Sequence, residues 1–250
     1  KADIKTLNPI LTATQEGNFN GTEAIGSIPF DGVILAHSNE SEWSKFSNNK
    51  DNEAFLDRVF TVKVPYSLRI SEEQKIYEKY INRESVLGNG QVSVAPQTLE
   101  TMAKFSVLTR LIEPENSSVY SKMRVYNGET LKDIDPNAKT ISEYRTMAGN
   151  HEGMEGFSTR SAFKVLSETF NSVAGKEPSA DPVHLMQVIE KTIDESEMSL
   201  ETKQKYKGFI GEYLEPEYLK FLDKEIKEAY LDDNGSYGQS VFNRYFDYAE

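Results

Sequence analysis

No cysteine occurs among the 250 residues of this sequence. Its absence excludes disulfide bonds, zinc sites built from thiolates and any cysteine nucleophile. Long apolar runs are also missing: the uninterrupted ones extend over only a few residues, whereas a membrane-spanning helix needs about 20. We therefore expect a soluble protein that makes no membrane contact. A cysteine-free chain is compatible with the reducing cytoplasm, where we expect it to reside.

Several catalytic signatures are missing as well. The sequence contains neither H-E-x-x-H nor G-x-S-x-G, and its three histidines, His37, His151 and His184, stand far apart. This pattern predicts no metal site and disfavours a serine–histidine triad. The motifs H-R-D and D-F-G do not occur either. A eukaryotic-type kinase catalytic lobe is therefore excluded from this stretch of chain.

Acidic side chains outnumber basic ones. The chain carries 40 aspartates and glutamates against 28 lysines and arginines, for a formal net charge of −12. These charges are spread along the sequence, which disfavours a broad surface for nucleic acid. The sequence begins at Lys1 without a signal-peptide pattern and ends within the pattern YFDYAE. We therefore expect a segment of a longer protein, large enough for more than one folded unit.

The first part of the chain has the pattern of an α/β fold. A buried strand is predicted over Val33–Ala36, where four apolar residues follow one another, and a second over Val59–Val64, where apolar residues alternate. Pro9 predicts the start of a helix, and NNKDNEAFLDR predicts a short helix between the strands. Because two strands alone do not form a stable sheet, we expect their partners before Lys1.

From Ser71 onward the pattern is helical. Apolar residues recur every three or four positions in six segments, which predicts helices over residues 71–82, 97–112, 158–170, 182–193, 200–214 and 216–231. A turn is predicted at 88–90 and a linker at 175–180. A long polar segment, residues 115–140, separates two of the helices, and so long a connection usually has a function or a packed irregular structure.

Three polar residues lie at the ends of these elements. Asn39 follows the first strand, Arg58 follows the short helix, and Arg160 opens a later helix. Each has an ordinary explanation when taken alone: a turn-forming Asn, an ion pair between Arg58 and Asp57, and an Arg facing water. Their order along the chain, however, resembles the second half of an AAA+ ATPase module.

The resemblance extends to one family within that superfamily. LTATQEGNFNGTEAIGSIPFDGVILAHSNESEW, NNKDNEAFLDRVFTVKVPYSLRISEEQKIYEKY and EPENSSVYSKMRVYNGETLKD are similar to bacterial PrkA-type serine protein kinases, as are GFSTRSAFKVLSETFN and EIKEAYLDDNGSYGQSVFNRYFDYAE. This resemblance covers nearly the whole chain. It implies an AAA+ domain followed by a kinase-like region, ATP-dependent phosphorylation of serine in a protein substrate, and a link to stress and sporulation responses.

The resemblance also assigns roles. It implies candidate catalytic residues Asn39 as sensor 1, Arg160 as sensor 2, and Arg58 as an arginine finger that acts across the boundary of a homo-oligomer, held in place by Asp57. Asn39 and Arg160 would contact ATP, which is used with Mg²⁺. The P-loop and the acidic Walker B strand are expected before Lys1. This segment alone is therefore expected to be inactive.

The implied fold class is the α/β tail of an AAA+ core followed by a mainly helical lid and extension. We expect the core tail over residues 1–70, the helical lid with sensor 2 over 71–175, and the helical C-terminal region over 176–250. Within the lid, the segment Glu113 to Asp133 has two interpretations. It is either a phosphate or partner site built around Lys122 and Arg124, or an irregular loop packed through Val119, Tyr120, Met123, Val125 and Tyr126, and the second is favoured.

Two other functions stay open. One is an ATP-driven remodeller or protease of AAA+ type, which would share the nucleotide site. The other is a helical module that docks a regulatory partner without catalysis. The acidic balance argues against nucleic acid as that partner, and tyrosines at helical spacing are more often core than interface.

Overall fold

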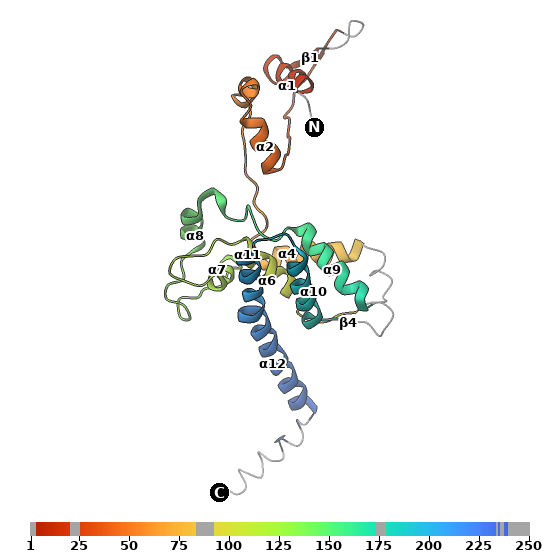
Figure 1. Cartoon of the computed structure of the whole chain (residues 1–250), viewed down its shortest axis with the longest axis vertical. Coiled ribbons are helices and arrows are strands. Elements are labelled where there is room, and N and C mark those ends of the chain that lie inside the picture. Colours follow the sequence, from red (N-terminus) through yellow and green to blue (C-terminus); the bar gives the residue numbers. More distant parts are fainter. Residues whose placement is uncertain are drawn as a thin grey trace. The chain divides into compact units, whose positions relative to one another are not determined.

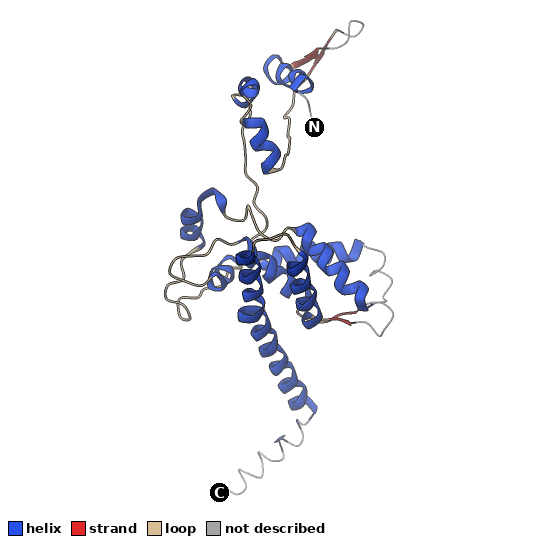
Figure 2. Cartoon of the chain, in the orientation of Figure 1, coloured by secondary structure: helices blue, strands red, loops and turns tan. Residues whose placement is uncertain are grey.

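The computed structural model describes residues 4–20, 26–83, 93–173, 179–233, 235, 238 and 239. The chain divides into two compact units, unit 1 (residues 1–63) and unit 2 (residues 64–250). Helices dominate the described residues (Figures 1 and 2), which confirms the expected mainly helical fold. The domain boundaries that we placed after residues 70 and 175 stay predictions.

Unit 1 consists of short elements. In chain order they are α1 (Ile4–Glu16), β1 (Asn18–Asn20), β2 (Ser27–Pro29), α2 (Glu40–Ser47), the 3₁₀ turn η1 (Lys50–Asn52) and α3 (Glu53–Leu56). Strands β1 and β2 form an antiparallel pair in which Phe19 faces Ile28. The predicted helix start at Pro9 is wrong, because α1 already begins at Ile4. Pro9 therefore lies inside the helix, where it has no amide to donate to the carbonyl of Lys5.

A small aromatic cluster joins the helical elements of unit 1. The ring centroids of Trp43 and Phe46 are 5.9 Å apart, and Phe46 meets Phe55 edge to face at 5.4 Å. Beside them, the buried side chain of Asn52 donates from Nδ2 to the carbonyl of Phe46 at 2.7 Å. This contact ties the 3₁₀ turn to the end of α2, and α3 follows directly.

Both strands predicted in unit 1 are wrong. Residues 33–36 and 59–64 have no strand structure, and their apolar side chains face solvent: Leu35 is 92% exposed and Phe60 is 94% exposed. The apolar pattern is present, but a strand forms only when a neighbouring strand pairs with its backbone groups. Among the described residues of unit 1, the only paired strands are β1 and β2, which pair with each other.

Unit 2 is a helical bundle. Its elements are α4 (Ile70–Arg83), β3 (Ser93–Val94), α6 (Thr98–Arg110), α7 (Val119–Tyr126), α8 (Ile141–Ala148), η2 (Gly149–His151), α9 (Thr159–Val173), β4 (Ser179–Ala180), α10 (Pro182–Glu195), α11 (Leu200–Phe209), the π-helical turn η3 (Ile210–Leu214) and α12 (Glu215–Asp233). The predicted turn at 88–90 lies outside the described residues. Of the predicted linker, the described part, Ser179–Ala180, is instead β4, which pairs in parallel with β3.

Helix α6 lies at the centre of this bundle. It contacts α4, α7, α9, α10, α11 and η3, and its residues from Thr101 to Leu108 are all buried. On every face of such a helix, the side chains have to be apolar or hydrogen-bonded to other groups of the protein. The apolar stripes predicted for residues 71–82, 158–170 and 182–193 pack around it, as the burial of Tyr77, Leu166, Phe170, Leu185, Ile189 and Ile193 confirms. The stripe predicted for residues 216–231 is wrong, because Leu219, Ile226 and Tyr230 are exposed.

Two helices of unit 2 were not predicted from the sequence. Helix α7 begins after Ser118, whose hydroxyl accepts from the amide of Ser121 at 2.9 Å. Helix α8 begins after Thr140, which forms a capping box with Glu143. Each is eight residues long, so neither is long enough to display a clear apolar period. The segment favoured as an irregular packed loop is indeed packed, but part of it is helical.

A buried ion pair connects four segments of unit 2. Arg110, at the end of α6, donates from Nη2 to Oε1 of Glu73 on α4 at 2.7 Å, and both side chains are fully buried. Arg110 also donates to the carbonyls of Phe157, at 2.9 Å, and Ser67, at 3.0 Å. Thr159, the first residue of α9, donates to the same oxygen of Glu73 at 3.3 Å. The pair therefore fixes where α4, α6 and α9 meet.

A second buried ion pair holds α7. Lys122 lies 2.7 Å from Glu152 and donates to the carbonyl of Ile112 at 2.8 Å, while Glu152 accepts from the amide of Ile112 at 3.0 Å. The side chains of Lys122 and Glu152 are 3% and 5% exposed. Lys122 is therefore committed to the core and is not available for the phosphate site that we considered for this segment.

Helices α11 and α12 are continuous through the π-helical turn η3. In this turn the amide of Glu215 donates to the carbonyl of Ile210, five residues earlier. Pro216 explains the wider turn, because it has no amide to donate to the carbonyl of Glu212 and its ring would press against that carbonyl. Beyond Leu222 the described side chains of α12 are exposed, as its extension from the rest of unit 2 shows in Figure 1.

We expect the Glu73–Arg110 pair to be needed for the stability of unit 2. Replacing Arg110 with Met leaves a buried carboxylate without its cation and should lower the free energy of unfolding by about 3–5 kcal/mol. The loss is measured by denaturant unfolding followed by circular dichroism, because the single tryptophan, Trp43, reports on unit 1.

The exposed pair Lys191–Glu168 is the matched control for this measurement. Replacing Lys191 with Ala should cost no more than about 1 kcal/mol. Adding Glu73→Leu to the Arg110 variant should recover part of the loss, since the lone buried charge is then gone. Equal effects of the Arg110 and Lys191 substitutions would show that the buried pair has no special role.

Candidate functional site

Asn39 caps helix α2 at its start. Its side-chain oxygen accepts from the amide of Glu42 at 2.8 Å and from the hydroxyl of Ser41 at 3.2 Å. This is the local role that asparagine most often has at such a position. In these interactions only the oxygen is used, so the side-chain amide nitrogen is the group through which Asn39 would donate to a phosphate. Whether it does so stays a prediction.

Arg58 follows α3 and is held from two sides. Its guanidinium donates to the carbonyl of Ala54, four residues earlier. The side-chain amide of Gln15 satisfies its neighbours when its oxygen points towards Arg58. In that orientation the oxygen accepts from Nε of Arg58 at 2.9 Å and from Nη2 at 3.0 Å. The expected support from Asp57 is wrong, since adjacent residues do not face each other on a helical turn. Gln15 takes that place.

Arg160 is an exposed residue in the first turn of α9, as predicted from the sequence. The preceding residue, Thr159, donates to Glu73 and so connects this turn to the buried Glu73–Arg110 pair. Asn39 and Arg58 belong to unit 1 and Arg160 to unit 2. Each is placed within its own unit, and their convergence around a nucleotide stays a prediction.

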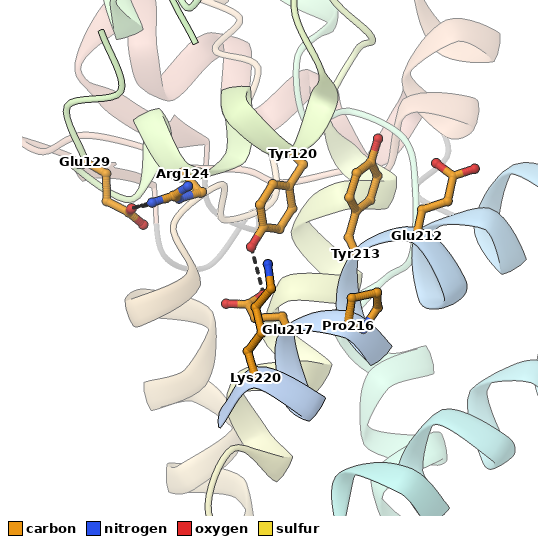
Figure 3. Close-up of a pocket in the computed structure, with 8 residues that line it drawn as sticks. All are labelled: Tyr120, Arg124, Glu129, Glu212, Tyr213, Pro216, Glu217 and Lys220. Atoms are coloured by element: carbon orange, nitrogen blue, oxygen red, sulfur yellow. Dashed lines mark hydrogen bonds and ion pairs between the residues drawn. The ribbon is translucent and has the colours of Figure 1, made fainter. Parts of the chain in front are cut away.

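Unit 2 contains a pocket of about 310 Å³ that the sequence did not indicate (Figure 3). It lies where α7 meets η3 and the start of α12. Its lining residues are Tyr120, Arg124, Glu129, Glu212, Tyr213, Pro216, Glu217 and Lys220. The rings of Tyr120 and Tyr213 stack nearly parallel on one side of it, with centroids 5.0 Å apart.

Most charges of the pocket are already paired. Arg124 donates to Oε2 of Glu129 from Nε at 2.8 Å and from Nη2 at 2.7 Å. Glu217 accepts from the hydroxyl of Tyr120 at 2.9 Å and from Lys104 at 2.8 Å. Burial lowers the pKa of Lys104, but its hydrogen bonds to Glu100 and Glu217 outweigh this and raise it overall.

The tyrosines of this region ionise with difficulty. Burial, and then the Glu217 carboxylate, raise the pKa of Tyr120 above its ordinary value. Burial, and then Glu212, do the same for Tyr213. Behind the pocket, at the end of α7, burial and the nearby Glu152 raise the pKa of Tyr126 to about 12. All three hydroxyls are therefore neutral at neutral pH, and that of Tyr120 donates to Glu217.

Only some of these residues could have been found from the sequence. The segment containing Tyr120 and Arg124 was singled out there, but the partners on η3 and α12 were not, because they come some 90 residues later. Within the described part of the chain, no cluster of three or more histidine or carboxylate side chains could hold a metal ion. None of the described helices is long and apolar enough to cross a membrane.

Comparison with known protein families divides the sequence near residue 119. The family described as "PrkA AAA domain" matches residues 1–118. The family described as "PrkA serine protein kinase C-terminal domain" matches residues 120–250. The division falls within unit 2, at the start of α7.

Curated relatives match over the whole chain. A protein of Escherichia coli strain K12 named "Serine/threonine kinase YeaG" is 58% identical over 250 residues, which is 100% of this chain and 38% of the relative. A protein of Bacillus subtilis strain 168 named "ATP-dependent protease PrkA" is 33% identical over 253 residues, with the same coverage of 100% and 38%. The chain thus spans well under half the length of these relatives. No solved structure matches it.

The raised pKa of Tyr126 predicts how stability changes at alkaline pH. A tyrosine has an ordinary pKa of about 10. Because the folded state raises it to about 12, the contribution of the neutral hydroxyl is complete below pH 10 and is lost as the pH rises through 12. The Tyr126→Phe variant should therefore lose less stability between these pH values than the unmodified protein, as measured by thermal unfolding.

Tyr230, which is 67% exposed on α12, provides the control. The Tyr230→Phe variant should follow the unmodified protein across the same pH range. If the Tyr126 and Tyr230 variants have the same alkaline profile, burial of Tyr126 does not control its ionisation.

Proposed function

Because the chain belongs to the PrkA family, we propose that it is part of an ATP-dependent serine protein kinase that transfers a phosphoryl group from ATP to serine in a protein substrate. The observation that carries this proposal is the similarity, over the entire chain, to a relative named as a serine/threonine kinase. The remaining length of such relatives is where we expect the P-loop and the acidic Walker B strand.

The finer fold assignment is the tail of an AAA+ core followed by a helical lid and extension. In this arrangement residues 33–36 and 59–64, which have no strand structure in this chain, would become strands only within the larger sheet of the longer protein. Their exposed apolar side chains, among them Val33 at 86% and Val64 at 80%, support the assignment, because a strand of a parallel sheet is apolar on both faces. Their pairing partners would come from the part of the longer protein that this chain does not include.

The proposed mechanism depends on positioning and charge. Phosphoryl transfer requires an in-line geometry and compensation of negative charge on the γ-phosphate, and Mg²⁺ would supply part of that compensation. Asn39, fixed at the start of α2, would orient a phosphate oxygen or the attacking group through its amide nitrogen. Arg58 would complete the site of a neighbouring subunit. The hydrogen bonds from Arg58 to Gln15 and Ala54 support this role, since a guanidinium that is already positioned loses less conformational entropy when it binds a phosphate.

Arg160 would report nucleotide binding to the helical lid. Its own helix begins at Thr159, which donates to Glu73 of the buried Glu73–Arg110 pair. A movement of Arg160 towards a phosphate would therefore be transmitted to α4 and α6. This connection supports sensor 2 as the role of Arg160.

A second candidate function is an ATP-driven protease. The relative from Bacillus subtilis carries that name, and both activities would share the nucleotide site. The same reasoning from Asn39, Arg58 and Arg160 would apply to ATP hydrolysis. What differs is the fate of the protein substrate, either phosphoserine or released peptides.

Substitution of Arg58 tests the proposed nucleotide site. In the full-length protein, Arg58→Ala should lower ATP turnover by about 10³- to 10⁵-fold, because the γ-phosphate loses its compensating charge. Binding of ATP should change little, as measured by calorimetry. Arg69→Ala, at an exposed arginine of unit 2, is the control and should leave turnover unchanged. Lost binding in the Arg58 variant would assign this arginine a different role.

A mixing experiment tests whether Arg58 acts between subunits. Asn39→Ala and Arg58→Ala proteins should each be inactive alone. Mixed, they should recover part of the ATP turnover, because some interfaces then pair an intact Asn39 with an intact Arg58 from the neighbour. If no mixture is more active than its components, Arg58 acts within its own subunit.

Radiolabelled ATP and a protein substrate separate the two candidate functions. A kinase should transfer label to serine, and this transfer should disappear when Mg²⁺ is chelated, since the metal would offset negative charge on the phosphates. A protease should release peptides without labelling the substrate. The second result would replace kinase by protease as the function.

A further inference from the structure

The pocket of unit 2 has an aromatic wall. Tyr120 and Tyr213 stack with their rings inclined by only 12°, and Figure 3 shows both beside the pocket. The guanidinium carbon of Arg124 lies 6.0 Å from the ring centre of Tyr120. Tyrosine rings attract cations through the negative potential of their faces. The guanidinium of Arg124 already makes such a contact, and the two tyrosine rings are suited to contact a second cation.

Carboxylates exceed cations around this wall. Arg124 and Glu129 offset each other, while Lys104 is shared between Glu217, at 2.8 Å, and Glu100, at 2.6 Å. Lys104 and its two glutamate partners therefore carry one more negative than positive charge. Burial is the main cause of the raised pKa values of Tyr120 and Tyr213, and the carboxylates of Glu217 and Glu212 raise them further.

Two charged residues of the lining have no ion pair with another described residue. Glu212 lies on the π-helical turn and Lys220 one turn into α12, and both are exposed. Pro216 displaces the backbone between them, as described above. Glu212 is thus an available carboxylate beside the tyrosines, and the exposed Lys220 would compete with a bound cation for the carboxylates of the lining.

The size and charge of the pocket exclude one class of ligand. A nucleotide phosphate would meet three lining carboxylates, Glu129, Glu212 and Glu217. The volume of about 310 Å³ is at the low end for small-molecule pockets. Such a pocket suits one long side chain that enters from a segment lying on the surface.

We propose that this pocket binds an arginine or lysine side chain of a protein segment, with Tyr120 and Tyr213 contacting its stem and cation and Glu212 pairing with its charge. Proteins with a basic residue near the target serine are then the substrate class. That last step rests on the proposed kinase function, whereas binding of the basic side chain does not.

The test uses the full-length protein and three labelled peptides. Each peptide is a glycine–serine sequence with one central arginine, lysine or glutamine, and binding is measured by fluorescence anisotropy without ATP. The arginine and lysine peptides should bind more tightly than the glutamine peptide. Phosphorylation of the serines in the same peptides is then measured separately with ATP.

Two substitutions that should change the affinity in opposite directions identify the pocket as the binding site. Glu212→Gln should weaken binding of the arginine peptide by about two- to fivefold, the range expected for an exposed charge pair. Lys220→Gln should strengthen it by a similar factor, because a competing cation is gone. Neither should change binding of the glutamine peptide. Both residues are exposed, so both variants should fold normally.

The outcomes separate this inference from the proposed function. Equal binding of the three peptides, or no effect of the two substitutions, overturns the pocket as a site for basic side chains. Reversed signs overturn it too and indicate an anion site. Binding with the predicted signs but without phosphorylation supports the pocket and counts against the kinase function.

Discussion

The helical unit depends on one buried charge pair. Glu73 and Arg110 are fully buried, and desolvating two charges costs several kcal/mol each unless further hydrogen bonds satisfy them. Arg110 meets this condition with the carbonyls of Ser67 and Phe157, and Oε1 of Glu73 meets it with the hydroxyls of Tyr77 and Thr159, whereas the buried Oε2 has no hydrogen-bond partner among the described residues. A hydrophobic contact tolerates small shifts, whereas these bonds require one arrangement. The pair therefore specifies how α4, α6 and α9 meet, and with them the position of Arg160.

The helices were largely predictable because their signals are local. The predicted start of α10 at residue 182 is confirmed, and its cause is local: Asp181 caps the helix by accepting from the amide of His184 at 2.9 Å. Strand signals are not local in this sense. The apolar pattern of residues 33–36 indicates a strand correctly only if another strand lies beside it, and the described residues of unit 1 supply none. Short helices such as α8 could not be predicted, because one face of two helical turns holds too few apolar residues to reveal a period.

The residues of the candidate site also differ in whether local sequence signals could predict their surroundings. The end of an element can be read from sequence, so Arg160 was correctly placed in the first turn of its helix. The support of Arg58 could not be read, because Gln15 comes 43 positions earlier and only the fold brings it close. The pocket was hidden for the same reason. Tyr120 and Glu217 are 97 residues apart, and no local pattern announces that their side chains share a hydrogen bond.

Two sets of residues in this chain have opposite electrostatic character. Asn39, Arg58 and Arg160 offer an amide and two cations, which suit a phosphate, whereas the pocket between α7 and α12 has aromatic rings and excess carboxylates, which repel one. A kinase needs both kinds of site, one for the polyanionic donor and one for the protein that receives the phosphoryl group. A carboxylate close to bound ATP would raise its free energy by charge repulsion, so the acidic lining of the pocket suits the protein and not the nucleotide. This division of charge is the arrangement expected if nucleotide and protein substrate are recognised by different parts of the chain.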